Sequence, residues 1–220
     1  MRWQDTVRTA GVIAIAIVVG GCGAMPTQNI GSAADLEDAK PGESLVAGRI
    51  HWSEDGEVKD ITDKLVGTVA LPMLIRLEDQ VRTWGVVAKD GSFVWSLEPG
   101  HYLIEEFQYR SNRGARPIVP RVAFAVPEAG GIYCIGTLRV YFDNVSSDVF
   151  MIPEGDLSIA VVDEYDECAQ RLTRKLSIQP TEVQRAMMFH DSRLPDTINW
   201  KGRVIQQSLI DSVIGGLWQY

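Results

Sequence analysis

Residues 90–104, DGSFVWSLEPGHYLI, decide the fold class that the sequence predicts. Two turn pairs, Asp90-Gly91 and Pro99-Gly100, each precede a short run rich in apolar and aromatic residues. Asp-Gly readily adopts positive φ values, and Pro-Gly combines a fixed φ with a free one, so both pairs favour sharp turns. The stretch therefore predicts two strands, at residues 92–97 and 101–109.

Similar short β-rich runs, separated by turn residues, extend in both directions along the chain. The other expected strands occupy residues 45–52, 65–77, 84–88, 121–126, 132–142, 149–152 and 157–162. Pro72 predicts a bend in its strand, and Gly136 is a candidate β-bulge. Residues 110–120 contain several Arg and Pro and predict a loop. About eight strands at this spacing favour a mainly β fold, either a sandwich or a barrel.

The stretch from Gly91 to Ile104 resembles the turn region of transthyretin-like, or carboxypeptidase regulatory-like, β-sandwiches. Residues 124–127 (FAVP) and 131–138 (GIYCIGTL) resemble a segment of uncharacterised bacterial lipoproteins that carry this sandwich. The resemblance implies an antiparallel sandwich over residues 45–162, with a hairpin whose Phe93 and Tyr102 face the core. It also implies a binding or structural module and not an enzyme, because relatives of this class are usually of that kind.

The pattern changes after residue 162, where a helical extension is expected over residues 163–220. Within residues 163–175 an apolar face recurs every three or four positions, which is typical of an amphipathic helix. The residues of this face are Tyr165, Cys168, Ala169, Leu172 and Leu176. Shorter helices are expected at residues 180–188 and within 200–218. The aromatic side chains of Trp200, Trp218 and Tyr220 either cap the core or dock on a partner or a bilayer interface.

The N-terminus has the layout of a secretory signal. A basic start precedes an apolar run at residues 10–19, which is too short for a comfortable membrane span. Val19-Gly20-Gly21-Cys22 resembles a bacterial lipobox, which implies cleavage after residue 21 and acylation at Cys22. An ordinary signal peptide and an uncleaved anchor are the alternatives. Residues 22–44 are rich in small and polar residues and predict a flexible tether.

Charge and the residue after the lipobox bear on location. The residue after Cys22 is Gly23, whereas lipoproteins retained in the inner membrane typically have Asp at that position. In this respect the chain resembles lipoproteins sorted to the outer membrane. We therefore expect a lipid anchor in the outer membrane that faces the periplasm, in preference to an anchor in the inner membrane. The leader holds two Arg and one Asp of the chain's 21 basic and 29 acidic residues, so the remainder has a net charge of −9. This balance argues against nucleic-acid binding and against electrostatic docking on anionic lipid.

Besides Cys22, the chain has Cys134 and Cys168. An even pair in an oxidising compartment favours a disulfide between them, and two separate buried thiols are the alternative. The resemblance lends the disulfide no support, because relatives commonly have Tyr at the position of Cys134.

No catalytic, metal or cofactor site is predicted. His51, His101 and His190 are far apart in sequence and show no metal-ligand spacing. Acidic residues at 163, 164, 166 and 167 match no calcium-loop spacing, and their placement at a helix N-terminus is favoured over a calcium site. The chain has no nucleophile elbow, phosphate-binding loop or dinucleotide fingerprint.

One basic segment stands out in this acidic chain. Its arginines are Arg110, Arg113, Arg116 and Arg121. They predict either a contact for an anionic polymer, such as a cell-wall or outer-membrane glycan, or a solvated loop.

Taken together, these features of the sequence favour a lipid-tethered accessory module that binds a protein partner in the cell envelope. A glycan binder is the second hypothesis, and an unrecognised hydrolase is the third.

Overall fold

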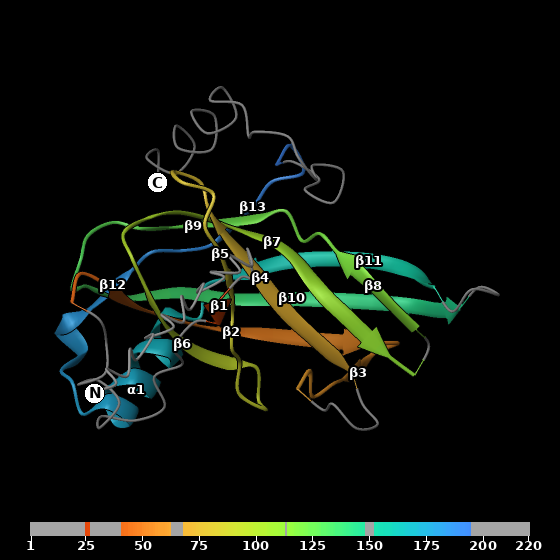
Figure 1. Cartoon of the computed structure of the whole chain (residues 1–220). Helices are drawn as coiled ribbons and strands as arrows, with labels where there is room; N and C mark the ends of the chain where they lie inside the picture. The colour runs from red at the N-terminus through yellow and green to blue at the C-terminus, as the bar shows by residue number, and fades with distance from the viewer. Residues whose placement is uncertain (1–24, 27–40, 63–67, 113, 148–151, 195–220) are drawn as a thin grey trace, which may run out of the picture.

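The computed structural model describes residues 25–26, 41–62, 68–112, 114–147 and 152–194. These residues form a mainly β structure in which two sheets enclose one core (Figure 1). Sheet A contains β1 (Met25–Pro26), β4 (Val69–Arg76), β5 (Arg82–Trp84), β7 (Gly100–Ser111), β8 (Gly114–Ile118), β9 (Val122–Val126) and β13 (Phe189–His190). Sheet B contains β2 (Ser44–Glu54), β3 (Glu57–Val58), β6 (Ser92–Leu97), β10 (Ile132–Ser147), β11 (Pro153–Val162) and β12 (Val183–Arg185).

The order in sheet A is β1-β5-β4-β7-β9-β13, with β8 also beside β7. Phe107 pairs with Ile118 of β8, and Ile104 pairs with Val122 of β9, so β8 and β9 follow each other along β7. The order in sheet B is β11-β10-β2-β3, with β6 along β2 and β12 along β10. β2 and β10 are parallel, and their register shifts between Cys134 and Thr137. This irregularity contains Gly136 with φ 85°, as the expected bulge requires.

Strands β6 and β7 do not form the hairpin that the resemblance implied. Leu97 pairs with Ser44 in sheet B, whereas Gly100 pairs with Val126 in sheet A. The Pro-Gly turn is therefore a corner that carries the chain from one sheet to the other. Phe93 and Tyr102 are both buried in the core between the sheets, as expected.

Two further expectations are wrong in detail. Only Trp84 of residues 84–88 belongs to a strand, because the chain crosses between the sheets after it. Gly85 fits this crossing, since a Cβ atom there would lie 2.7 Å from Pro72 and 2.8 Å from Trp95. Residues 110–120 are not one loop, because β7 continues to Ser111 and β8 runs back along it. Pro117 is tolerated in β8 because the described residues place this strand at an edge.

Aromatic side chains fill the core between the sheets. Trp52 of sheet B stacks on Tyr109 of sheet A with ring centroids 5.5 Å apart, and its ring meets Phe107 edge-on at 5.4 Å. Tyr102 stacks on Phe124 at 5.3 Å. Burial of such large side chains is the main stabilising contribution to the sandwich.

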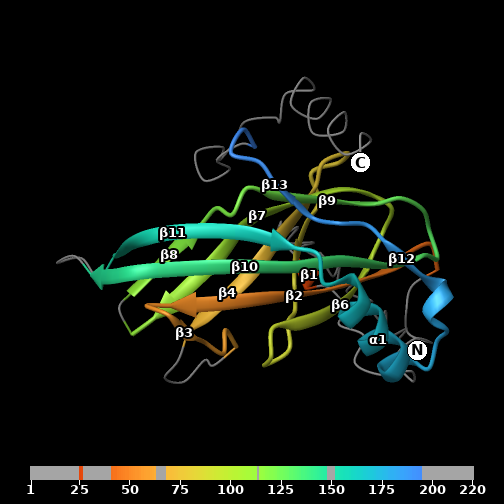
Figure 2. The ribbon, with the colours of Figure 1, turned by 180° about the vertical axis from the view of Figure 1, so that it is seen from behind.

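The helix α1 (Tyr165–Leu176) lies where the apolar periodicity predicted it, and it packs on one end of the outer face of sheet B (Figure 2). The buried residues Cys168, Ala169, Leu172 and Leu176 pack against Leu45, Ala47, Val94 and Cys134 of the sheet. Cys134 and Cys168 are joined by a disulfide, with their Cα atoms 6.1 Å apart. The bond attaches α1 to a central strand of sheet B.

The extension after α1 is not a second helix over residues 180–188. Only the turn η2 (Pro180–Glu182) is helical, and the chain then becomes extended. β12 runs parallel to β10, and β13 pairs with β9, so this segment contacts both sheets. Residues 200–218 and Tyr220 lie outside the described residues, as do residues 1–21 and Cys22. Within the described part, no helix is long and apolar enough to span a membrane.

Candidate functional site

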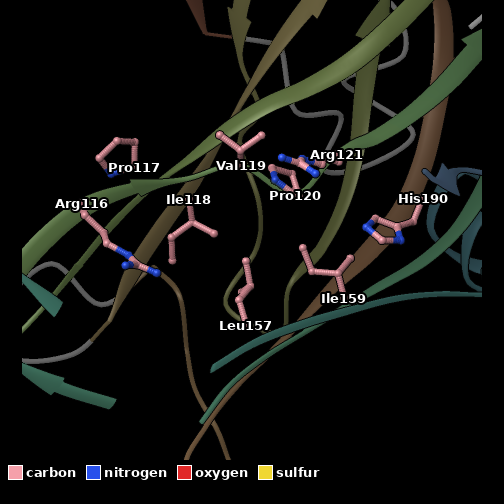
Figure 3. A pocket seen from close by; sticks show the side chains of 9 residues that line it. All are labelled: Arg116, Pro117, Ile118, Val119, Pro120, Arg121, Leu157, Ile159 and His190. Carbon is pink, nitrogen blue, oxygen red and sulfur yellow. The ribbon is translucent and has the colours of Figure 1, made fainter. Parts of the chain in front are cut away.

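A cleft of about 380 Å³ opens along one side of the sandwich, between the β8–β9 segment and β11 (Figure 3). It is lined by Arg116, Pro117, Ile118, Val119, Pro120, Arg121, Leu157, Ile159 and His190. Its volume lies in the lower part of the range of roughly 300–1,000 Å³ that small-molecule sites occupy.

The floor of the cleft is apolar. Leu157 and Ile159 are two residues apart on β11, so their side chains point to the same side of the strand. They lie across the middle of the cleft from Ile118 of β8, which is only 2% exposed (Figure 3). Leu157 is 37% exposed, so this floor is open to a ligand.

Arg116 lies at one end of the cleft with an incompletely satisfied guanidinium. Its strand position is opposite Tyr109, a core residue, so the side chain turns toward the space between the sheets. The guanidinium lies 5.1 Å from the centroid of the Phe142 ring. Its Nε atom is buried and forms no hydrogen bond within the described part of the chain. A buried donor without an acceptor costs about 1–3 kcal/mol, and the charge of this guanidinium favours an oxyanion at this end of the cleft.

Arg121 and His190 lie at the other end. Arg121 has φ 53° and links β8 to β9, and its guanidinium donates to the Ser192 carbonyl at 2.8 Å. Its own carbonyl accepts from the Asp191 amide at 3.2 Å, so the segment after β13 is fixed to this end of the cleft. His190 pairs with Val122 and its side chain is exposed.

The cleft is lined by positively charged side chains, whereas the whole chain has a net charge of −8. None of the described residues that line it is Asp or Glu. The nearby Asp191 is bound by Arg193 at 2.6 Å, and this contact lowers the pKa of its carboxyl to about 2. The carboxylate is thus already engaged outside the cleft. The arrangement suits the binding of a ligand that brings its own negative charge.

The structure brings together only part of the predicted basic patch. Arg116 and Arg121 both line the cleft. Arg110 is exposed and lies one position along the β7–β8 ladder from the Tyr109–Arg116 pair, so it points to the opposite face of sheet A. Arg113 lies outside the described residues. Arg110 therefore does not share the cleft with Arg116 and Arg121, because alternate residues of the β7–β8 ladder point to opposite faces.

Sequence reasoning missed His190 as a site residue. No local pattern could have linked it to Arg121, because only the pairing of β13 with β9 brings the two together. The other histidines lie elsewhere: His101 is 2.7 Å from Glu78, and His51 lies on β2 beside Arg139.

A second polar group lies on the outer face of sheet B beside α1, around Glu164. Glu164 accepts hydrogen bonds from the Thr137 hydroxyl at 2.6 Å and from the Arg139 guanidinium at 2.7 Å. The Thr137 bond, with Arg139, lowers the pKa of this carboxyl below its ordinary value. Burial and the charges of Arg49 and Arg139 lower the pKa of His51 nearby. These contacts account for Glu164 as part of the packing between α1 and β10.

The other acidic residues before and within α1 have different partners and positions. Asp163 pairs with Arg185 at 2.9 Å and accepts from the Tyr165 amide. Asp166 and Glu167 lie in the first turn, where negative charge complements the helix dipole.

Comparisons with known protein families, characterised proteins and solved structures find no match. The geometry of the cleft is therefore the basis on which a function is proposed below.

Proposed function

We propose that this chain is a lipid-tethered, non-enzymatic binding module of the bacterial cell envelope, and that it binds its partner through the cleft between β8 and β11. The cleft carries the proposal: two arginines and a histidine surround an apolar floor with no Asp or Glu among the lining residues. In a chain with a net charge of −8, such a site favours recognition of an anionic group.

The anchor in this proposal is a lipid on Cys22, in the outer membrane and facing the periplasm. The lipobox-like Val19-Gly20-Gly21-Cys22 and the following Gly23 support it. Stable anchoring takes two or more acyl chains, which an acylated N-terminal Cys would carry. Residues 22–44 would give the sandwich its distance from the bilayer.

The sandwich in this proposal is transthyretin-like. The turns at Asp90-Gly91 and Pro99-Gly100, together with the buried Phe93 and Tyr102, support that assignment. A fold of this kind does not specify a function, so the cleft remains the functional argument.

Crosslinking in intact cells, followed by affinity purification and mass spectrometry, tests the proposal. The forms compared are the unmodified chain, Cys22→Ala, the double variant Arg116→Gln/Arg121→Gln and Arg110→Gln. The last changes one charge on the opposite face of sheet A and serves as the matched control. We expect the same crosslinked partner from the unmodified chain and Arg110→Gln, and its loss from the double variant.

Two results would overturn separate parts of the proposal. A Cys22→Ala chain that fractionates with membranes as the unmodified chain does would remove the lipid anchor. An identical set of crosslinked species from the unmodified chain and the double variant would remove the cleft.

An anionic envelope glycan is the second candidate partner. The unpaired Nε of Arg116 favours it, because phosphate and carboxylate groups on such polymers accept charge-assisted hydrogen bonds. Glycan that co-purifies with the unmodified chain and is lost from the double variant would select this candidate over a protein.

A further inference from the structure

The polar groups of the cleft occupy two ends, and the apolar groups occupy the middle. Arg116 lies on one side in Figure 3, while Arg121 and His190 lie on the other, with Ile118, Leu157 and Ile159 between them. A simple anion site would instead gather its donors around one point. The separation therefore specifies the shape of the ligand as well as its charge.

We infer that the cleft takes an elongated ligand with an aliphatic middle and an oxyanion, carboxylate or phosphate, at each end. This inference rests on the proposed function in placing the binding surface at the cleft, and it names the chemical group that is bound there, whether free or carried by a larger partner.

Each end of the ligand has a specific donor. One oxyanion lies against the guanidinium of Arg116, which lines this end of the cleft and is oriented over the Phe142 ring. The other lies between the guanidinium of Arg121 and the imidazole of His190. Arg121 gives one hydrogen bond to Ser192, which fixes its position and leaves other N–H groups of the five on a guanidinium.

The middle of the ligand is apolar because the side chains that line the middle of the cleft are apolar. Ile118 and Ile159 continue the core of the sandwich to the surface, and Leu157 remains 37% exposed above them. An aliphatic chain laid along these side chains removes apolar area from water on both partners, which is favourable at about 25 cal/mol per Å². A polar spacer would lose this contribution.

Equilibrium dialysis of radiolabelled probes against the full chain in nanodiscs of zwitterionic lipid tests the inference. Empty nanodiscs correct for partition into lipid. The probes are octanedioate, octanoate, 1,8-octanediol and inorganic phosphate, which vary the number of charged ends and the aliphatic part separately. We expect octanedioate to bind about tenfold more tightly than octanoate, because it can form charge-assisted hydrogen bonds at both ends of the cleft and octanoate at only one. The diol and phosphate should bind more weakly still.

Single variants assign the two ends. Arg116→Gln and His190→Gln should each reduce octanedioate affinity toward that of octanoate, while Arg110→Gln should leave it unchanged. His190 has an exposed side chain, so its variant keeps the test valid if Arg116→Gln does not fold. Near-ultraviolet circular dichroism checks that each variant keeps its packing.

Equal affinity for octanedioate and octanoate would overturn the two-ended ligand. Absence of binding by all four probes would also overturn it. If the crosslinked partner is still lost from the Arg116→Gln/Arg121→Gln double variant in that case, the proposed function survives without this ligand class.

Discussion

Cys134, on a central strand of sheet B, is bonded to Cys168, on the buried face of the one helix of the described residues. The bond closes a loop of 34 residues that contains the rest of β10 and all of β11. It therefore joins the helix to the strand that also borders the cleft strand β11.

Removal of this bond should destabilise the domain. We expect the double variant Cys134→Ala/Cys168→Ala to lose about 2–4 kcal/mol in free energy of unfolding, because the unfolded chain regains loop entropy. Urea denaturation measures the loss. Reductant should lower the midpoint of the unmodified chain and leave that of the double variant unchanged. Equal midpoints for the unmodified chain with and without reductant would show that the bond is not formed.

Gly91 should tolerate no side chain. Its φ is 78°, and a Cβ atom would lie 2.0 Å from the Ile50 carbonyl oxygen. Gly130 offers a matched control, since its φ is 75° and no atom lies within 4 Å of such a Cβ. We expect Gly130→Ala to cost about 1 kcal/mol for the left-handed conformation alone. Gly91→Ala should cost about 1–3 kcal/mol more, from overpacking. Equal unfolding free energies for the two variants would contradict this account.

The hydrogen bond from Thr68 to the buried Glu54 should stabilise the folded chain. Thr68 donates to Glu54 at 2.8 Å, and the Trp52 indole donates to the same oxygen at 3.1 Å. Thr68→Val removes one donor from a carboxyl that is 7% exposed, so we expect a loss of about 1–3 kcal/mol. In the control, Thr62→Val, the lost bond to Asp60 is less buried and should cost under about 1 kcal/mol. Thermal unfolding ranks the two variants, and the reverse order would count against the buried network.

The contribution of Glu164 to the stability of the folded chain should be lost at acid pH. Its pKa is lowered from the ordinary value of 4.5, chiefly by the Thr137 hydroxyl and also by Arg139. As pH falls below 4.5, the unfolded chain takes up a proton before the folded one does, so this stabilisation is present above pH 4.5 and is lost as pH falls through the folded pKa. We expect Glu164→Gln to lower the melting temperature most at pH 6–7. The gap should narrow below pH 4.5, whereas a gap that stays constant from pH 7 to pH 3 would exclude this role.

Local patterns in the sequence predicted several elements well. The three-to-four-residue spacing of Cys168, Leu172 and Leu176 predicted α1 within two residues at its start and one at its end. Apolar runs predicted the positions of β2, β6, β9 and the first part of β10, because each is a mostly buried segment with turn residues beside it. β10 continues past the expected end at residue 142 to Ser147, and over residues 143–146 its side chains become more exposed. Such signals lie within about ten residues and need no knowledge of pairing.

The pairing of the strands, and therefore the face on which each side chain lies, could not be predicted from the sequence. The side chains of Arg110 and Arg116 lie on opposite faces because β8 pairs with β7, and the Pro117 within β8 concealed that strand. Likewise, Arg121 and His190 share the cleft through the contact between β9 and β13. These relationships depend on register between distant segments, and a one-residue shift would exchange the faces.

The parallel pairing of β2 and β10 has a kinetic consequence. Leu45 in β2 lies beside Ile132 in β10, so the centre of sheet B cannot form until the chain has been synthesised at least as far as β10. Contacts between such distant segments slow folding, because the loop between them must close before the contacts contribute. Until then, the apolar edge of β2 stays unprotected. A newly made chain would therefore carry an open strand edge, able to pair with another chain, until β10 closes on it.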